Sequence, residues 1–135
     1  MARYYSDKKK TVEECLTLTT KHLKNELTRA MEIDHHGLIQ SGTLSWGKNQ
    51  VRYETERHSV ACYIRLQYVR SDVFTGQKNN VDLSIKMSHT IPHYGGYRWW
   101  FICPLKGCER RVAKLHKPPL AAYFGCRHCH NLTYQ

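Results

Sequence analysis

Two cysteine pairs in the last third of the chain constrain its fold more than any other feature. Four residues separate Cys103 from Cys108, two separate Cys126 from Cys129, and 17 lie between the pairs. Each short pair forms a tight turn that presents two sulfurs, and Zn²⁺ prefers a tetrahedron of thiolates. The spacing predicts a structural zinc ribbon, with a small β-hairpin and its turn between the two pairs.

The predicted zinc ligands are Cys103, Cys108, Cys126 and Cys129. Pro104 can preset the first turn, and Gly107 gives it the conformational freedom that a close approach of backbone to sulfur needs. Replacement of one cysteine by a histidine stays open, because three histidines lie nearby: His116, His128 and His130. Four thiolates leave no coordination position for water, whereas catalytic zinc keeps one. We therefore expect structural Zn²⁺ as the cofactor.

The composition narrows the partners and the compartment. A formal net charge of +10 over 135 residues favours a polyanion, nucleic acid first and an anionic membrane second, unless the chain is merely a basic soluble protein. The first ten residues show no apolar run typical of a secretory signal, and no stretch approaches about 18 apolar residues. We expect a reducing, cytoplasmic location without membrane contact, where cysteine pairs bind metal more often than they form disulfides.

Helical spacing marks the front of the chain. Thr11 and Glu14 match a capping box, which predicts a short helical turn. Further on, apolar residues recur at i, i+4, i+7 and i+8, namely Leu23, Leu27, Ala30 and Met31. This pattern predicts an amphipathic helix over roughly residues 20–33, with Thr19 or Thr20 as its N-cap.

The middle of the chain changes to the period of a β-strand. Residues 60–69 and 81–88 alternate apolar and polar side chains, and the turn-forming segment 71–80 suits a hairpin loop between them. Residues 43–46 and 97–102 give further strands. We expect three or four antiparallel strands, in a sheet that either stays open or closes into a barrel.

Together these elements predict an α+β fold with an N-terminal helical segment, a small antiparallel β-sheet and a C-terminal zinc ribbon. The predicted parts are a flexible basic arm (1–10), a body of helix and sheet (11–94) and a ribbon segment packed on the body (95–135). The other two cysteines, Cys15 near a helix start and Cys62 on the apolar face of a strand, are expected to be small buried hydrophobes.

The ribbon segment combines basic and aromatic side chains. From residue 95 onward it carries seven basic residues and a single acid, Glu109, so it stays basic even after four thiolates bind Zn²⁺. Cations neutralise phosphates and rings stack on unpaired bases, which predicts a nucleic-acid surface. Its expected residues are Arg98, Arg110, Arg111, Lys114, Lys117 and Arg127. The alternative is that one face of this strand is core, since Trp99 and Phe101 share a face opposite to Trp100.

Three stretches carry a resemblance to a known family: Gly95–Pro104, Cys108–Leu115 and Phe124–Tyr134. They resemble small bacterial proteins that are often associated with mobile or phage-derived DNA, and Thr11–Trp46 is similar to the front of those proteins more loosely. The resemblance implies a ribbon-like metal site at the four cysteines and an association with mobile elements. It implies no particular activity.

Three functions stay open. The first is a non-enzymatic protein that binds nucleic acid, DNA rather than RNA. The second is an adaptor or inhibitor that engages a nucleic-acid-processing protein complex. The third, a nuclease, rests on Asp34 and His35, which match the Asp-His step of His-Asn-His enzymes. These residues precede both cysteine pairs by more than 60 residues, and phosphoryl chemistry with two metals needs clustered carboxylates. We therefore expect no enzymatic activity.

Overall fold

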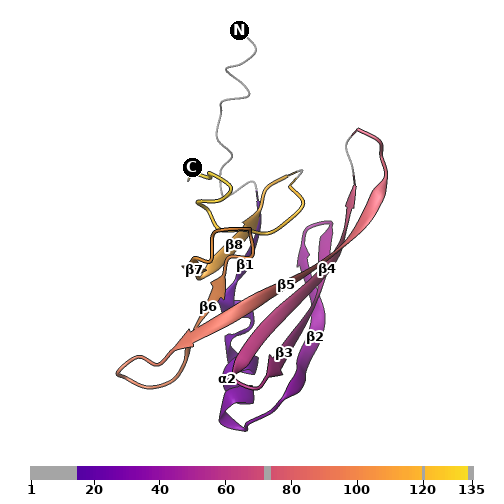
Figure 1. Cartoon of the computed structure of the whole chain (residues 1–135). Helices are drawn as coiled ribbons and strands as arrows, with labels where there is room; N and C mark the ends of the chain where they lie inside the picture. Colours follow the sequence, from indigo (N-terminus) through magenta and orange to yellow (C-terminus); the bar gives the residue numbers. More distant parts are fainter. Residues whose placement is uncertain (1–14, 72–73, 120, 134–135) are drawn as a thin grey trace.

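The computed structural model describes residues 15–71, 74–119 and 121–133. In this part of the chain it shows a six-stranded antiparallel sheet, a two-stranded sheet and a single α-helix (Figure 1). The elements in chain order are β1 (Leu16–Thr19), a 3₁₀ turn (Thr20–His22), α2 (Lys24–Glu32), β2 (Gly37–Trp46), β3 (Asn49–His58), β4 (Ala61–Ser71), β5 (Lys78–Thr90), β6 (Arg98–Ile102), β7 (Arg111–Val112) and β8 (Lys114–Lys117). The small α+β fold is therefore mostly β.

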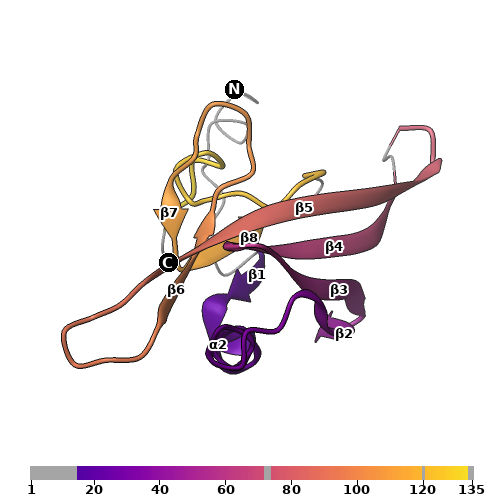
Figure 2. The same ribbon diagram turned by 60° about the horizontal axis from the view of Figure 1, so that its bottom comes forward.

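The larger sheet runs in the order β2-β3-β4-β5-β6-β7. It stays open, because its edge strands β2 and β7 do not pair with each other within the described residues. Figure 2 shows α2 and β1 on the same side of this curled sheet. The core lies on that side, since Leu18 of β1 and Leu27 of α2 form one buried cluster with Ile64 and Phe101 of the sheet.

The two strands predicted from strict alternation are confirmed as β4 and β5. Their inward residues include Cys62, Ile64 and Ile85, each at most 2% exposed, so Cys62 is the small buried hydrophobe that was expected. Val60 does not continue the pattern. It lies in the turn before β4 and is 81% exposed. The expected hairpin between β4 and β5 is present, with Ser71 opposite Lys78.

Strand β3 was not predicted, although it follows the same period. It pairs with β2 across the turn at Gly47 and with β4 on its other side. Its buried side chains are Val51, Tyr53, Thr55 and Arg57. Two of these four side chains, Thr55 and Arg57, are polar. A search for apolar residues at every second position therefore does not detect this strand.

The expectation of a helical N-terminal segment is corrected, because the fold is mostly β and residues 16–19, before the predicted helix, form strand β1 and pair with β8. Cys15 is half-buried and precedes a strand instead of a helix. The capping box at Thr11 and Glu14 and the basic arm lie outside the described residues. Helix α2 is shorter than predicted and begins after Leu23, and neither Thr19 nor Leu23 caps a helical turn through its side chain. No helix in the described ranges has the length and apolarity to cross a membrane.

Buried Arg57 fastens the end of α2 to the sheet. The helix closes in a Schellman turn, where His35 N donates to Ala30 O at 2.9 Å and Asp34, at φ 55°, turns the chain. From β3, Arg57 donates Nη1 to Ala30 O at 3.3 Å and Nε to Ser59 O at 2.9 Å. Its Nη1 also lies 3.1 Å from the Asp34 carboxylate. The guanidinium thus gives the Ala30 carbonyl at the helix end a second donor and links it to the turn after β3.

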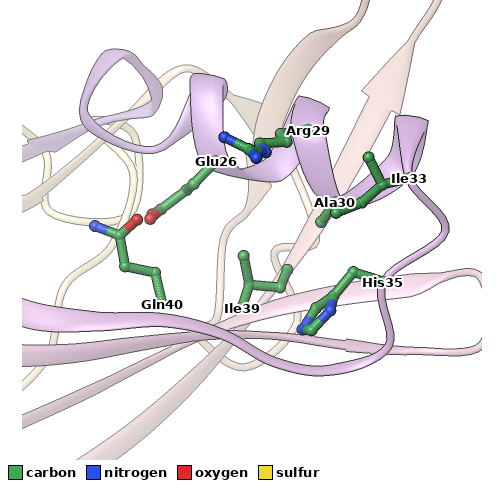
Figure 3. Close-up of a pocket in the computed structure, with 7 residues that line it drawn as sticks. All are labelled: Glu26, Arg29, Ala30, Ile33, His35, Ile39 and Gln40. Atoms are coloured by element: carbon green, nitrogen blue, oxygen red, sulfur yellow. The ribbon is translucent and has the colours of Figure 1, made fainter.

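Glu26 lies between α2 and β2 at a cavity of about 250 Å³ (Figure 3). Both of its carboxyl oxygens are shielded from solvent and have no hydrogen-bond partner among the described residues. Figure 3 shows Glu26 and Gln40 pointing toward each other, but Gln40 donates Nε2 to Tyr53 Oη at 3.2 Å. Burial disfavours the charged carboxylate and raises the pKa of Glu26 from 4.5 to about 7.

We expect Glu26 to make the protein less stable as the pH rises from 4.5 to about 7. Over that interval the unfolded chain has released the Glu26 proton and the folded chain still holds it, so the free energy of unfolding falls. Glu26→Gln imitates the neutral carboxyl and should remove this decline in denaturant titrations across the interval. Glu32→Gln, on the exposed end of the same helix, is the control and should keep it. Identical pH profiles for the wild type and Glu26→Gln would contradict a buried neutral carboxyl.

Candidate metal centre

The structure brings the four predicted cysteines together. Their Sγ atoms all lie within 4.8 Å of one another. Cys103 Sγ is 3.9 Å from Cys129 Sγ, and Cys108 Sγ is 3.7 Å from Cys126 Sγ. A tetrahedron with zinc–sulfur bonds of about 2.3 Å has edges of about 3.8 Å, whereas a disulfide needs about 2.05 Å. The donor set therefore fits one tetrahedral metal ion.

The first pair sits in a turn between β6 and β7. Cys103 N donates to Arg110 O at 2.8 Å, which closes the turn at its base, and Cys108 N donates to Leu105 O at 3.1 Å. Gly107 has φ +81°, a left-handed conformation that a side chain would strain. The four residues between Cys103 and Cys108 thus form a turn that requires glycine at position 107, just before Cys108.

The second pair follows a short bridge between His116 of β8 and Gly125. The two backbones exchange hydrogen bonds of 2.7 and 2.9 Å. Cys126 N then donates to Cys103 Sγ at 3.3 Å, and Cys129 N donates to Cys126 Sγ at 3.4 Å. Such N–H donors stabilise sulfur as the negatively charged thiolate.

The predicted hairpin between the two pairs is reduced to the single antiparallel bridge between His116 and Gly125. Strand β7 pairs with β6, and β8 pairs with β1, so the intervening residues divide between the two sheets. Each cysteine pair consequently closes its own loop, one on the large sheet and one beside the small sheet.

The pKa values of Cys103, Cys108 and Cys129 are shifted in different directions. Burial raises the pKa of Cys103, and burial together with the neighbouring sulfurs raises the pKa of Cys129. Burial opposes ionisation of Cys108 as well, but the Arg110 N–H and the neighbouring thiols outweigh it and lower the pKa of Cys108 to about 7. One thiolate forms readily and makes the next one harder to form. A bound cation allows all four sulfurs to carry charge together.

No histidine joins the sulfur group in the described residues. His116 is buried, and its Nδ1 lies 2.9 Å from Thr17 Oγ1. His130 donates Nε2 to Tyr123 O at 3.1 Å. Burial lowers the pKa of both rings. These two histidines support the loop that carries the second pair.

Phe124 anchors the second pair to the body of the fold. It is fully buried, and its ring centroid lies 6.2 Å from Trp46 and 5.9 Å from Tyr68. Tyr68 Oη donates to Ala122 O on the same loop, and Trp46 Nε1 donates to Thr17 O of β1 at 3.1 Å. An aromatic contact therefore fixes the chain two residues before a metal ligand.

The predicted basic surface is divided. The guanidinium carbon of Arg98 lies 4.4 Å from the ring centroid of Trp100. Arg98 is four residues along β6 from Ile102, which pairs with Arg111. The two arginines are therefore roughly 13 Å apart along the strand. Lys117 is half-buried, with Nζ 5.9 Å from the ring centroid of Tyr68. The face opposite to Trp100, that of Trp99 and Phe101, is core, as the alternative interpretation held.

The remaining cations lie beside the two cysteine pairs in the sequence, with Arg111 in β7 and Lys114 in β8. Arg110 and Arg111 come two and three residues after Cys108 and are exposed. Lys114 and Arg127 both approach His116 closely enough to oppose its protonation, although burial is the larger cause of its lowered pKa. These four residues form what we call the loop cations.

Sequence reasoning missed how the two loops fit together. A Cβ on Gly125 would lie 2.3 Å from Leu105 Cδ1 and 2.9 Å from His130 Nε2. Leu105 comes from the first loop, so the absence of a side chain at position 125 lets the loops approach. A glycine directly before a cysteine pair was the available signal.

Comparison with known proteins adds no family to this geometry, because no family model, curated protein or solved structure matches the chain.

We expect Cys126→Ser to abolish stoichiometric metal binding, because Cys126 is fully buried and lies 3.7 Å from Cys108 Sγ. Elemental analysis of purified protein should give about one metal ion per wild-type chain and close to none in the variant. Cys62→Ser is the control: it also alters a buried cysteine, loses stability, and keeps the metal. Full metal content in Cys126→Ser would rule out the four-sulfur site.

We expect Gly125→Ala to destabilise the metal-loaded protein by about 1–3 kcal/mol, because the added methyl overlaps Leu105 and His130. Leu105→Ala removes the closer neighbour. In denaturant titrations the double variant should therefore lose less than the sum of the two single losses. Strict additivity would mean that the two loops do not meet at this point.

Proposed function

We propose that this protein is a non-enzymatic zinc-ribbon protein that binds nucleic acid, and that zinc shapes its binding surface. Zinc is the metal that four thiolates in a tetrahedral arrangement favour, and a reducing cytoplasm keeps such cysteines available. Bound there, Zn²⁺ would be held by Cys103, Cys108, Cys126 and Cys129 and would act as a structural cross-link.

The observation that carries the proposal is a group of exposed cations on and beside the short strands β7 and β8, between the two cysteine pairs. Arg110, Arg111 and Lys114 are exposed. None of them forms an ion pair with a carboxylate in the described residues, whereas Arg57 and Arg65 do. Exposed cations that form no ion pair are available to phosphates, and each contact releases a counterion.

A non-enzymatic role is supported by the chemistry of the donors. Four sulfurs fill a tetrahedral metal and leave no place for a reacting water. In the described residues no other group of three or more His, Cys, Asp or Glu side chains gathers as a metal site. Asp34, the residue on which a nuclease would depend, contacts Arg57 and His36 at the end of α2 instead.

DNA is the nucleic acid that we favour over RNA. The support is the resemblance of the C-terminal motif to bacterial proteins associated with mobile or phage-derived DNA. An adaptor that engages a nucleic-acid-processing complex is the competing function. It predicts a stoichiometric protein partner on purification and weak binding to free DNA.

Charge removal on the loop cations tests the proposal. We expect Arg111→Gln/Lys114→Gln to weaken duplex DNA binding and to reduce the slope of log K against log salt by about 2, or about 1 for each phosphate contact. Fluorescence anisotropy at several salt concentrations measures both quantities. The control, Lys48→Gln/Lys78→Gln, removes the same charge from exposed turn and strand-end positions. Equal losses in the two double variants would mean that net charge alone attracts DNA, and no binding by the wild type at low salt would refute the function.

A further inference from the structure

A second cleft lies along α2 and shares Arg29 and Ile33 with the cavity of Figure 3. It has a volume of about 540 Å³, and its lining residues come from α2 and from the segment that leads into β6. Lys24, Thr28, Arg29 and Tyr97 are among them. Volumes of about 300–1,000 Å³ are typical of sites for small organic molecules. The cleft is therefore large enough for one nucleotide.

Tyr97 provides a fixed aromatic wall. Its ring stacks on Trp99 with an interplanar angle of 27° and a centroid distance of 6.2 Å. His89 meets the Tyr97 ring edge-on at 5.3 Å. Trp99 is itself 3% exposed and donates Nε1 to Thr28 Oγ1 of α2 at 3.0 Å. The ring is thus held in place before any ligand arrives, which lowers the entropic cost of stacking on it.

Two cations line the opposite wall. Lys24 and Arg29 are exposed, and neither forms an ion pair in the part of the chain that the structure describes. The only acid in the lining is Glu32, so the cleft keeps an excess of positive charge. A cleft with a fixed ring on one side and two free cations on the other matches the chemistry of a base joined to a phosphate.

The rim of the cleft is apolar and accessible. Ile33 lines it and is 62% exposed. The loop between β5 and β6, which leads to Tyr97, turns at Pro92 with a hydrogen bond of 2.9 Å from Gly95 N and carries Tyr94 at 78% exposure. Figure 1 shows this loop projecting from the sheet beside α2, at the end of the molecule away from the C-terminal segment. Neighbouring bases of an extended strand could contact these side chains.

We propose that the cleft between α2 and Tyr97 binds one unpaired nucleotide of a single-stranded nucleic acid, with the base on Tyr97 and phosphate on Lys24 and Arg29. The inference rests on the proposed function and adds to it a site for unpaired bases, separate from the loop cations. Paired bases are stacked inside a duplex and cannot enter the cleft singly, so the two sites differ in the form of nucleic acid that they take.

The test compares a short oligothymidine with a duplex of the same length, by fluorescence anisotropy on the metal-loaded full chain. Lys24→Gln/Arg29→Gln should weaken oligothymidine binding about tenfold and reduce its salt slope by about 1.4, or about 0.7 for each of two phosphate contacts. Tyr97→Leu, which keeps an apolar contact for Trp99, should weaken the same binding about tenfold through lost stacking and leave the salt slope unchanged. Thermal unfolding verifies that each variant is folded.

The control is Lys48→Gln/Lys78→Gln, and duplex binding by the cleft variants should fall no further than in this control. Oligothymidine binding that matches the control in both cleft variants would overturn the site. Equal losses on duplex and single strand would also overturn it, because the cleft would then act only through charge. A wild type that binds duplex but no single strand refutes this inference and leaves the proposed function standing, whereas one that binds neither refutes both.

Discussion

Mutual repulsion among four sulfurs is the constraint on which the C-terminal third of this protein depends. Atoms held 3.7 to 3.9 Å apart cannot all be thiolates unless a cation lies among them. The two loops have little core of their own. Arg110 and Arg111 are exposed. The backbone of the two loops is held mainly by hydrogen bonds from N–H groups to sulfur and by short turns. The positions of the loop cations therefore depend on how firmly the four sulfurs are held together.

The rest of the fold supports this site through apolar contacts. Phe124 brings the second loop against Trp46 and Tyr68, and Gly125 lets Leu105 of the first loop approach. The sulfur group and the aromatic contact thus do different things: a metal ion held by the sulfurs would join the two loops to each other, whereas the ring joins one of them to the sheet. Loss of metal should loosen the loops while the body, with its continuous cluster from β1 through β6, keeps its core.

Much of this could be predicted from local pattern. The cysteine spacing gave the four sulfurs that meet, and alternation gave β4 and β5, because both signals lie within a short stretch of chain. Strand β3 escaped because Thr55 and Arg57 occupy inward positions that are usually apolar, and their polar groups are satisfied by partners the sequence does not reveal. Strand β1 escaped because its partner is β8, and no local period indicates so distant a pairing. The cleft at Tyr97 depends on the same kind of long-range contact, from Trp99 to Thr28.

The pairing of β1 with β8 also sets the order in which the chain can assemble. Thr17 faces His116, 99 residues further along, so a ribosome must deliver most of the protein before β1 finds its partner. Closing so long a loop is entropically costly and slow compared with forming the local hairpins of β2 to β5. Those hairpins can therefore form first, and the part of their apolar face that β1 covers stays exposed until β1 pairs with β8. If the four sulfurs hold a metal ion, its capture would be among the last events in the maturation of the protein, because Cys126 and Cys129 follow β8.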